Sequence, residues 1–193
     1  MFINKRLFDL FFSTIVILFV LLWLIPAVAI IIYLQSGELF FFQQKRIGQF
    51  GKPFNIYKFR SMKGVSPKND PLLSEDEQSR ITKFGSFLRK YRIDEFPQFI
   101  NVWKGEMSIV GPRPERQFFL DQIIKELPSY SKMQNLKPGI TSIGQIKYGY
   151  ADTLAQMLER ARYDLIYLKK RSFWLDFKLI LKTVFVVLKG KGK

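Results

Sequence analysis

The hydrophobic pattern of this chain begins with an uncharged apolar run in its N-terminal part. No charged residue occurs from Leu10 to Gly37, and most of the run is aliphatic or aromatic. Such a run is long enough to cross the hydrocarbon core of a bilayer and too long for the core of a signal peptide. It shows no small-residue cleavage site, so we expect residues 1–37 to anchor the mature protein to a membrane.

One proline, Pro26, lies inside this run. Proline removes a backbone donor, clashes with the preceding turn and disfavours the α conformation of Ile25. Two interpretations are open: a kinked helix that spans the membrane, since membrane helices tolerate proline, and a helix-break-helix that enters and leaves by the same face. Lys5 and Arg6 precede the run and a basic sequence follows it, so the positive-inside rule slightly favours the re-entrant form.

Beyond the apolar run the pattern changes to short alternating segments. Residues 39–44 and 53–62 predict two strands on either side of GQFGK. Strict alternation in the second strand places Lys58 and Arg60 on one face. Residues 64–71 predict a loop, because Gly, Pro and Asn are concentrated there.

Helical patterns dominate the following segments. Residues 74–77 have the form of a capping box and predict a helix that runs through residues 81–92. A second helix is expected to begin near Asp94 and to continue through FPQFINVWKG, where apolar residues recur at helical spacing. We expect rigid turns at 110–115 and 137–142, because each contains proline and glycine.

Two further helices are expected at the C-terminal end, over residues 152–171 and 172–193. The last one places Lys178 and Lys182 on one face and carries aromatic residues near its start. This pattern suits a helix on a membrane surface, and a buried terminal helix accounts for it almost as well. No internal repeat or low-complexity linker occurs, so we expect one domain over residues 38–193.

Composition changes the picture by indicating the partner. The formal net charge is +15, while 48% of the residues are hydrophobic and 20 are Phe. A basic chain suits a polyanionic partner, which can be nucleic acid, an anionic membrane surface or a phosphorylated substrate. The long apolar run favours the membrane, and the chain carries no recognisable nucleic-acid reading motif, so we expect no nucleic-acid partner.

The absence of both Cys and His restricts the chemistry. It excludes disulfides, thiol nucleophiles, imidazole bases and His metal sites. Catalysis by this chain must therefore use carboxylates, Lys, Arg, hydroxyl groups or a metal bound through oxygen. The adjacent acids Asp94 and Glu95 gain weight from this restriction.

Two interpretations of Asp94 and Glu95 are open at this point. The pair can be an ordinary acidic helix start, where free backbone N–H groups and the helix dipole stabilise an anion and Pro97 is tolerated. It can also be a reaction centre, because an ionised, positioned Asp can attack phosphorus and form a covalent intermediate. Adjacent carboxylates can in addition bind Mg²⁺ together with substrate phosphates.

Candidate phosphate-binding cations lie elsewhere in the chain. Lys58 and Arg60 share a strand face, and Arg113 lies between two prolines in GPRP, where little further entropy is lost on binding. Each can equally be a solvated surface residue. For Asp164, an ion pair with Arg160 or with the neighbourhood of Lys169 on one helix is the simpler interpretation.

Five motifs occur in a fixed order: QKRIG, YKFRSM, LRKYRIDEFPQFINVWKGEMSIVGPRP, KPGIT and YDLIYLKKRSFWLDFKLILKT. Together they resemble the bacterial sugar transferase family, the small monotopic phosphoglycosyl transferases. The resemblance covers nearly the whole chain. The block at 88–114 is highly specific, because the acidic pair, the amphipathic helix, KGxMS and GPRP follow one another at fixed spacing.

The resemblance implies a fold and a location. The expected fold is α/β, mostly α with a small sheet, in a single compact domain over 38–193 on a re-entrant helix-break-helix over 1–37, with its break at Pro26. The implied location is the cytoplasmic face of the bacterial inner membrane, against the anionic inner leaflet.

The resemblance also implies a reaction. A sugar phosphate passes from a UDP-sugar to a polyprenyl phosphate, such as undecaprenyl phosphate, with release of UMP, as the first membrane step of surface-glycan assembly. Asp94 is implied as the nucleophile, carrying the phosphoglycosyl group, and as a ligand of Mg²⁺; Glu95 is implied to manage protons or metal. Substrate or phosphate contacts are implied for Lys58, Arg60, Arg113 and Asp164.

The chain departs from the family pattern at residues 142–150, where SIGQIKYGY replaces the usual motif. Because of this departure, the sequence does not identify the sugar that is transferred. It does not determine the oligomeric state either. The departure also motivates an alternative function, that of an inactive membrane-attached relative that binds lipid-linked or acidic glycans.

Overall fold

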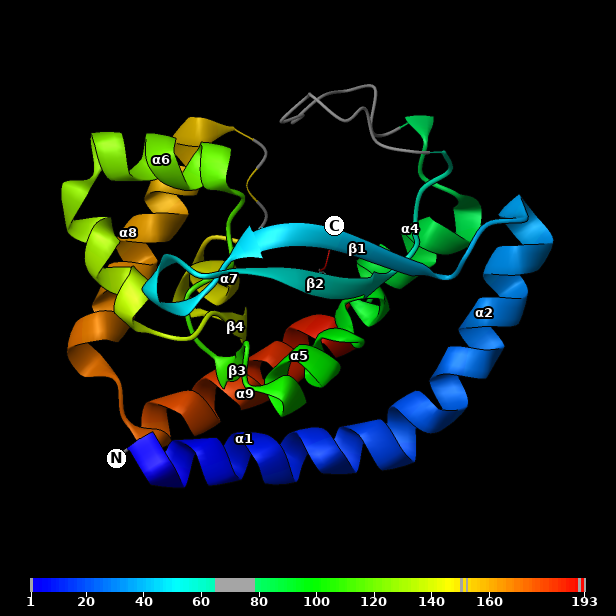
Figure 1. The fold of residues 1–193 in the computed structure, drawn as a ribbon, viewed down its shortest axis with the longest axis horizontal. Coiled ribbons are helices and arrows are strands. Elements are labelled where there is room, and N and C mark those ends of the chain that lie inside the picture. Colours follow the sequence, from blue (N-terminus) through cyan, green and yellow to red (C-terminus); the bar gives the residue numbers. More distant parts are fainter. Residues whose placement is uncertain (1, 65–78, 150, 152, 191, 193) are drawn as a thin grey trace.

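The computed structural model describes residues 2–64, 79–149, 151, 153–190 and 192. The described chain is mostly helical and contains two small sheets, which confirms the expected fold class (Figure 1). The larger hydrophobic core includes Val102, Met107, Ile123 and Ala161, and a smaller one joins the N-terminal helix to Phe59 and other residues of the domain.

The N-terminal apolar segment is one bent helix. It comprises α1 (Phe2–Val16), a π-helical turn (Ile17–Leu21) and α2 (Leu22–Ser36). Figure 1 shows α1 running beneath the domain and α2 turning upward along its side. The part from Lys5 to Ser36 is the one helix among the described residues that is long and apolar enough to cross a membrane.

The expected interruption at Ile25 and Pro26 is wrong in one respect, because both residues are helical and Pro26 lies inside α2. The departure from α geometry lies upstream, in the π turn, where the N–H of Leu22 donates to the carbonyl of Ile17. Proline and π turns are both recognised causes of bending. The helix is therefore bent without a non-helical break.

Both ends of the bent helix contact the same folded domain. At its start, Lys5 Nζ lies 2.5 Å from Asp176 Oδ2, and the backbone N–H of Ile109 donates to Asp9 over 3.1 Å. Just beyond its other end, Glu38 pairs with Arg60 over 3.2 Å and accepts the backbone N–H of Gly64. These contacts hold the start and the end of the apolar helix against one body.

The two expected strands form an antiparallel hairpin. Strand β1 (Phe41–Ile47) pairs with β2 (Pro53–Phe59), and the register runs from Phe41 opposite Phe59 to Ile47 opposite Pro53. A 3₁₀ turn, η2 (Gln49–Gly51), connects them. Ile56 is buried in the larger core, and Phe59, on the opposite face of the strand, is buried in the smaller one. Arg60, which was expected to share a face with Lys58, lies beyond the end of the strand.

The expected helix start at residues 74–77 lies outside the described residues. The expected continuation of this helix through 81–92 is wrong at its first residues, which are not helical. Ile81 forms an antiparallel bridge with Met62, which requires extended backbone. Helix α4 (Lys83–Lys90) begins only after Thr82, whose side chain accepts the N–H of Gly85. Pairing with the end of the hairpin therefore outweighs the helical pattern.

The GPRP and KPGIT motifs lie side by side. Strand β3 (Ser108–Val110) pairs in parallel with β4 (Gly139–Thr141), and Gly139 N–H donates to Pro112 O over 2.8 Å. A β-carbon on Gly111 would lie 2.3 Å from Lys137 O. Only glycine permits this approach, which fixes the turn that carries Arg113.

The remaining helices surround this centre. They are the 3₁₀ turn η3 (Ile93–Glu95), α5 (Gln98–Lys104), α6 (Gln117–Glu126), the 3₁₀ helix η4 (Pro128–Asn135), α7 (Ile143–Lys147), α8 (Leu154–Lys170) and α9 (Phe173–Leu188). Along α9 the polar residue Asp176 and the apolar residue Leu179 are buried. Phe173 and Trp174, the aromatic residues at its start, are exposed.

We propose from the contacts at its two ends that the apolar helix enters and leaves the membrane by the same face. A spanning helix would place Lys5 and Glu38 on opposite sides of the bilayer and would separate Lys5 from Asp176. The chain has no native cysteine, so Asn4→Cys and Lys189→Cys each introduce one labelling site. Both are expected to react with an impermeant maleimide in inside-out vesicles and to be protected in right-side-out vesicles. Labelling of residue 4 in right-side-out vesicles alone would contradict re-entry.

Candidate active site

Asp94 and Glu95 lie in the 3₁₀ turn η3, between α4 and α5, and both are buried, with 8% and 7% of their surface exposed. Arg92 enters this turn in the left-handed conformation, with φ 52°. The pair does precede a helix, as predicted. The N–H groups of Glu95 and Phe96, however, donate to the carbonyls of Arg92 and Ile93, so they do not serve the Asp94 carboxylate.

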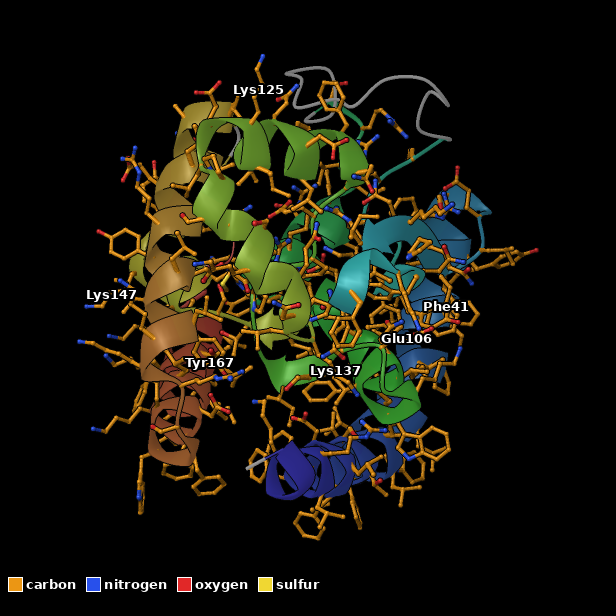
Figure 2. All side chains as sticks on the ribbon, turned by 60° about the vertical axis from the view of Figure 1, so that its left-hand side comes forward. Phe41, Glu106, Lys125, Lys137, Lys147 and Tyr167 are labelled. Atoms are coloured by element: carbon orange, nitrogen blue, oxygen red, sulfur yellow. The ribbon has the colours of Figure 1, made fainter. Side chains whose placement is uncertain are left out.

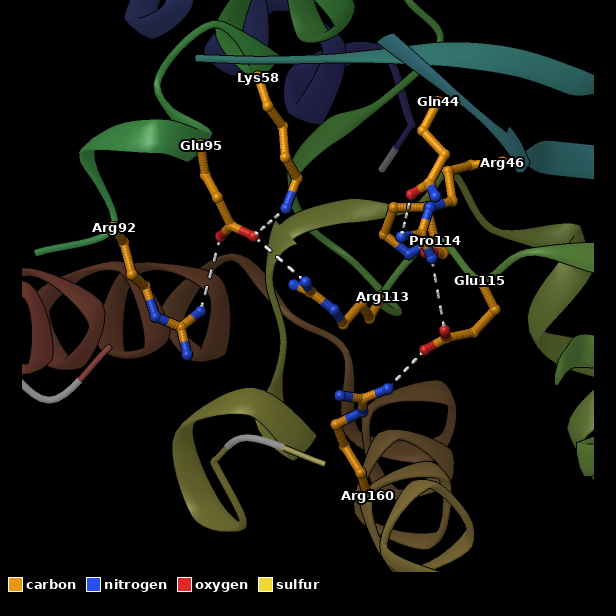
Figure 3. Close-up of polar contacts among 9 residues, drawn as sticks. All are labelled: Gln44, Arg46, Lys58, Arg92, Glu95, Arg113, Pro114, Glu115 and Arg160. Atoms are coloured by element: carbon orange, nitrogen blue, oxygen red, sulfur yellow. Dashed lines mark hydrogen bonds and ion pairs between the residues drawn. The ribbon is translucent and has the colours of Figure 1, made fainter. Parts of the chain in front are cut away.

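Glu95 is surrounded by three cations from three segments (Figure 3). Its Oε1 lies 2.9 Å from Lys58 Nζ and 3.2 Å from an Arg113 nitrogen, and its Oε2 lies 3.7 Å from Arg92. Burial opposes ionisation of Glu95, but Lys58, Arg113 and Arg92 outweigh it and hold the pKa of Glu95 well below its usual value. Glu95 is therefore a carboxylate at neutral pH.

Asp94 is shifted in the opposite direction. Burial raises the pKa of Asp94 to about 6, and the neighbouring Glu95 charge adds to the rise, while Lys58 and Arg89 oppose it. Adjacent carboxyl groups whose pKa values are driven apart are typical of sites in which each has its own task. At pH 7 most Asp94 is still ionised, but with weak solvation, which suits a nucleophile.

The turn that carries Arg113 is held by a second set of ion pairs. Arg160 donates to Glu115 over 2.6 Å, and Arg46 lies 3.8 Å from the same carboxylate and donates to Pro114 O (Figure 3). Sequence reasoning assigned no role to Arg46 or Glu115, and it expected Arg160 to pair with Asp164 instead. The signals were a charge inside a strand at Arg46 and an acid directly after GPRP at Glu115.

The structure places the other predicted residues differently. Arg60 pairs with Glu38 and donates to Leu39 O, so its recorded contacts are at the end of the apolar helix and not at Glu95. Asp164 is buried and accepts the N–H of Gly144 over 2.7 Å. The expected pairing of Asp164 with Arg160 is wrong, because Arg160 extends to Glu115.

Asp164 therefore anchors the start of α7, in the segment that departs from the family pattern. Burial raises the pKa of Asp164 to about 6, opposed by the hydrogen bonds from Gly144 and Ser142. A β-carbon on Gly144 would lie 2.9 Å from Asp164 Oδ1 and 2.6 Å from Arg160 O, so α7 packs directly on α8.

The family model described as bacterial sugar transferase matches residues 1–190 of the chain. The chain belongs to the bacterial sugar transferase family. This confirms the resemblance drawn from the five motifs.

Curated relatives of this family member have names that describe one type of reaction. It is 40% identical over 169 residues to the UDP-N-acetylgalactosamine-undecaprenyl-phosphate N-acetylgalactosaminephosphotransferase of Aeromonas hydrophila, covering 88% of the chain and 40% of the relative. It is 40% identical over 185 residues to the UDP-glucose:undecaprenyl-phosphate glucose-1-phosphate transferase of Escherichia coli K12, covering 94% and 39%. The chain thus spans about two fifths of the length of these relatives.

A relative of similar size carries a less specific name. The uncharacterized sugar transferase EpsL of Bacillus subtilis is 37% identical over 194 residues, which is 98% of the chain and 90% of that protein.

The donor set for a metal in this family member is small. Among the residues that the structure describes, no group of three or more Asp or Glu side chains is placed to hold a metal ion. Glu95 is engaged by three cations, which leaves the Asp94 carboxylate as the protein donor at the centre of the site. Mg²⁺ is usually bound by one or two carboxylates together with substrate phosphates, so this donor set is compatible with it.

The two acids of this family member are expected to affect stability in opposite directions. Because burial raises the pKa of Asp94, ionised Asp94 weakens folding at neutral pH, and Asp94→Asn should raise the free energy of unfolding by about 1–3 kcal/mol. Glu95→Gln leaves three partly buried cations without their counter-charge and should lower it by about 3–5 kcal/mol. Thermal unfolding in detergent at pH 7.5 measures both.

At this chain length each kcal/mol corresponds to about 2–4 °C in Tm. The exposed Asp121→Asn is the matched control, since it makes the same chemical change outside the site. A lower Tm in Asp94→Asn, or an unchanged Tm in Glu95→Gln, would contradict the assigned charge states.

Proposed function

We propose that this chain transfers a sugar phosphate from a UDP-sugar to a polyprenyl phosphate such as undecaprenyl phosphate, releasing UMP and forming a polyprenyl-diphosphate-linked sugar. The observation that carries the proposal is the buried Asp94, with a raised pKa, beside a carboxylate that gathers Lys58 and Arg113. The names of the relatives support the substrate classes, because each gives a UDP-sugar and undecaprenyl phosphate.

The reaction proceeds in two displacements at one phosphorus atom. A carboxylate oxygen of Asp94 attacks the β-phosphorus of the UDP-sugar, and the bond to the oxygen shared with the α-phosphorus breaks, so UMP leaves with that electron pair. The lipid phosphate oxygen then attacks the same phosphorus and the bond to Asp94 breaks, which restores the carboxylate. Both nucleophiles are anionic, so the absence of His from the sequence is no obstacle.

The role of Glu95 is that of a counter-ion. The sequence suggested proton or metal management, but a carboxylate with a strongly lowered pKa and three cationic partners is a poor proton carrier at neutral pH. Its contacts support a different task, in which Glu95 keeps Lys58, Arg92 and Arg113 together in the absence of substrate. Phosphate oxygens of the substrate then pair with these cations in place of Glu95 or alongside it. These cations offset the repulsion between two polyanionic substrates.

Mg²⁺ belongs to the same proposal. Asp94 would be its protein ligand, with the remaining positions filled by substrate phosphates and water. When bound, the ion neutralises the diphosphate of the UDP-sugar. Arg113 and Lys58 orient the phosphates around Asp94, and Arg60 and Asp164 act at a distance, Asp164 through the start of α7.

The membrane location is proposed from the exposed apolar surface. Phe11, Phe19 and Trp23 of the bent helix are exposed, as are Trp174 and Phe185 of α9. Because most apolar residues of α9 face outward, a position on the anionic inner leaflet accounts for this helix better than a buried one. The domain then lies on the cytoplasmic face, where UDP-sugars are available.

Activity tests the nucleophile directly. In membranes or detergent with polyprenyl phosphate, the unchanged chain is expected to release UMP from one member of a panel of UDP-sugars, and Asp94→Asn to reduce the rate at least about a thousandfold. Asp121→Asn should retain it. Full turnover by Asp94→Asn would refute the mechanism, and UMP release from no sugar would favour the alternative of an inactive glycan-binding relative.

The rate of the first displacement is expected to fall in acid. With the pKa of Asp94 at about 6, the ionised fraction drops from about nine tenths at pH 7 to about one tenth at pH 5, which predicts an approximately tenfold loss. Single-turnover release of UMP, measured without acceptor lipid, isolates this step. Circular dichroism checks that the protein is folded at both pH values. A flat profile over this range would contradict the assignment of Asp94 as the titrating nucleophile.

A further inference from the structure

A pocket separate from the acidic pair lies at the junction of the bent helix with the domain. Its volume is about 320 Å³, and it is bounded by α1, β3, the segment before β4, the end of α8 and the start of α9. None of Lys58, Asp94, Glu95 or Arg113 lines it. The proposed transfer reaction therefore gives this pocket no role.

Four cations and two carboxylates are among the described residues of its lining: Lys5, Arg6, Lys137, Arg171, Asp9 and Asp176. Both carboxylates have partners within the protein. Asp176 pairs with Lys5 and accepts the hydroxyl of Tyr167 over 2.7 Å, and Asp9 accepts the N–H of Ile109. The remaining charge in the pocket is positive.

Lys137 is the cation that this arrangement leaves available. The described part of the chain offers its ammonium group no hydrogen bond or ion pair, although its side chain is partly buried. Lys137 Nζ and Arg6 Nη2 lie 3.5 and 3.3 Å from the position that a β-carbon on Gly105 would occupy, so the two cations converge. Burial, and then Arg6, lower the pKa of Lys137, and the opposing effect of the Asp9 charge does not offset them.

The pocket also lies at the depth of lipid headgroups in the proposed membrane orientation. Lys5 and Arg6 are the last cations before the uncharged run that starts at Leu10. Exposed apolar side chains flank the pocket on both helices, Leu7 on α1 and Trp174 on α9, and Phe8 and Phe173 join the helices edge to face at 5.6 Å. Cations beside an apolar surface suit an anionic headgroup whose chains remain in the membrane.

We propose that this pocket binds the headgroup phosphate of an anionic glycerophospholipid, which fixes the start of the bent helix against the domain. The phosphate lies against Lys137 and Arg6, while the acyl chains follow the apolar surfaces of α1 and α9. The ligand is a structural lipid and not the acceptor of the transfer reaction, because the pocket excludes Asp94 and its cations.

The test is a titration of the purified full chain with dioctanoyl phosphatidylglycerol, followed by native mass spectrometry. Lys137→Gln is expected to raise the dissociation constant about fivefold, because it removes one cation. Arg171→Gln should raise it by a similar factor for the same reason. Lys137→Arg and the control Lys125→Gln should bind within twofold of the unchanged chain. Lys137 and Tyr167 both line the pocket, whereas Lys125 lies at the top of the view in Figure 2, away from both.

Three outcomes would overturn the proposal. The first is equal affinity of Lys137→Gln and Lys125→Gln for the lipid. The second is displacement of the lipid by inorganic phosphate at the same concentration, which indicates a plain anion site. The third is displacement by an equal concentration of undecaprenyl phosphate, which assigns the pocket to the acceptor. The measurement uses no UDP-sugar, so its failure is distinct from a failure of the proposed reaction.

Discussion

The ion cluster around Glu95 is the interaction on which the rest of the site depends. One carboxylate holds Lys58 of the hairpin, Arg92 of the turn that precedes it and Arg113 of the GPRP turn. Without Glu95 these cations would repel one another across a buried space, and Asp94 would lose the neighbour that helps to raise its pKa. The cluster thus sets both the position of these three cations and the charge state of the adjacent acid.

Backbone geometry supports this cluster from two sides. The close approach of Gly111 to the carbonyl of Lys137 fixes the GPRP turn, and the Arg46–Glu115–Arg160 ion pairs hold its far end. On the other side, Arg92 adopts the left-handed conformation and reverses the chain direction after α4, directly before the 3₁₀ turn that carries Asp94 and Glu95. Such positioning lets a site with two carboxylates and a few cations act without imidazole or thiol groups.

The elements that carry the candidate site also contact the bent N-terminal helix. The start of the bent helix contacts α5, β3 and α9, and its end leads into the hairpin that carries Lys58. In the proposed membrane orientation, a change in how the helix sits in the bilayer would therefore be transmitted to the elements of the site. The lipid pocket proposed at Lys137 lies on the motif that packs against GPRP, so a bound headgroup would stabilise both sides of this connection.

The sequence by itself determined the local and patterned features: the long apolar N-terminal segment, the hairpin that carries Lys58, the acidic pair ahead of α5 and the family membership carried by five motifs. It misjudged the helix through residue 81 and the partner of Asp164, because a bridge from Met62 and a buried contact from Glu115 come from distant segments. The opposite charge tendencies of Asp94 and Glu95 were likewise decided only by the tertiary structure. Burial and the convergence of Lys58, Arg92 and Arg113 set these pKa values, and neither is encoded in the local spacing of residues.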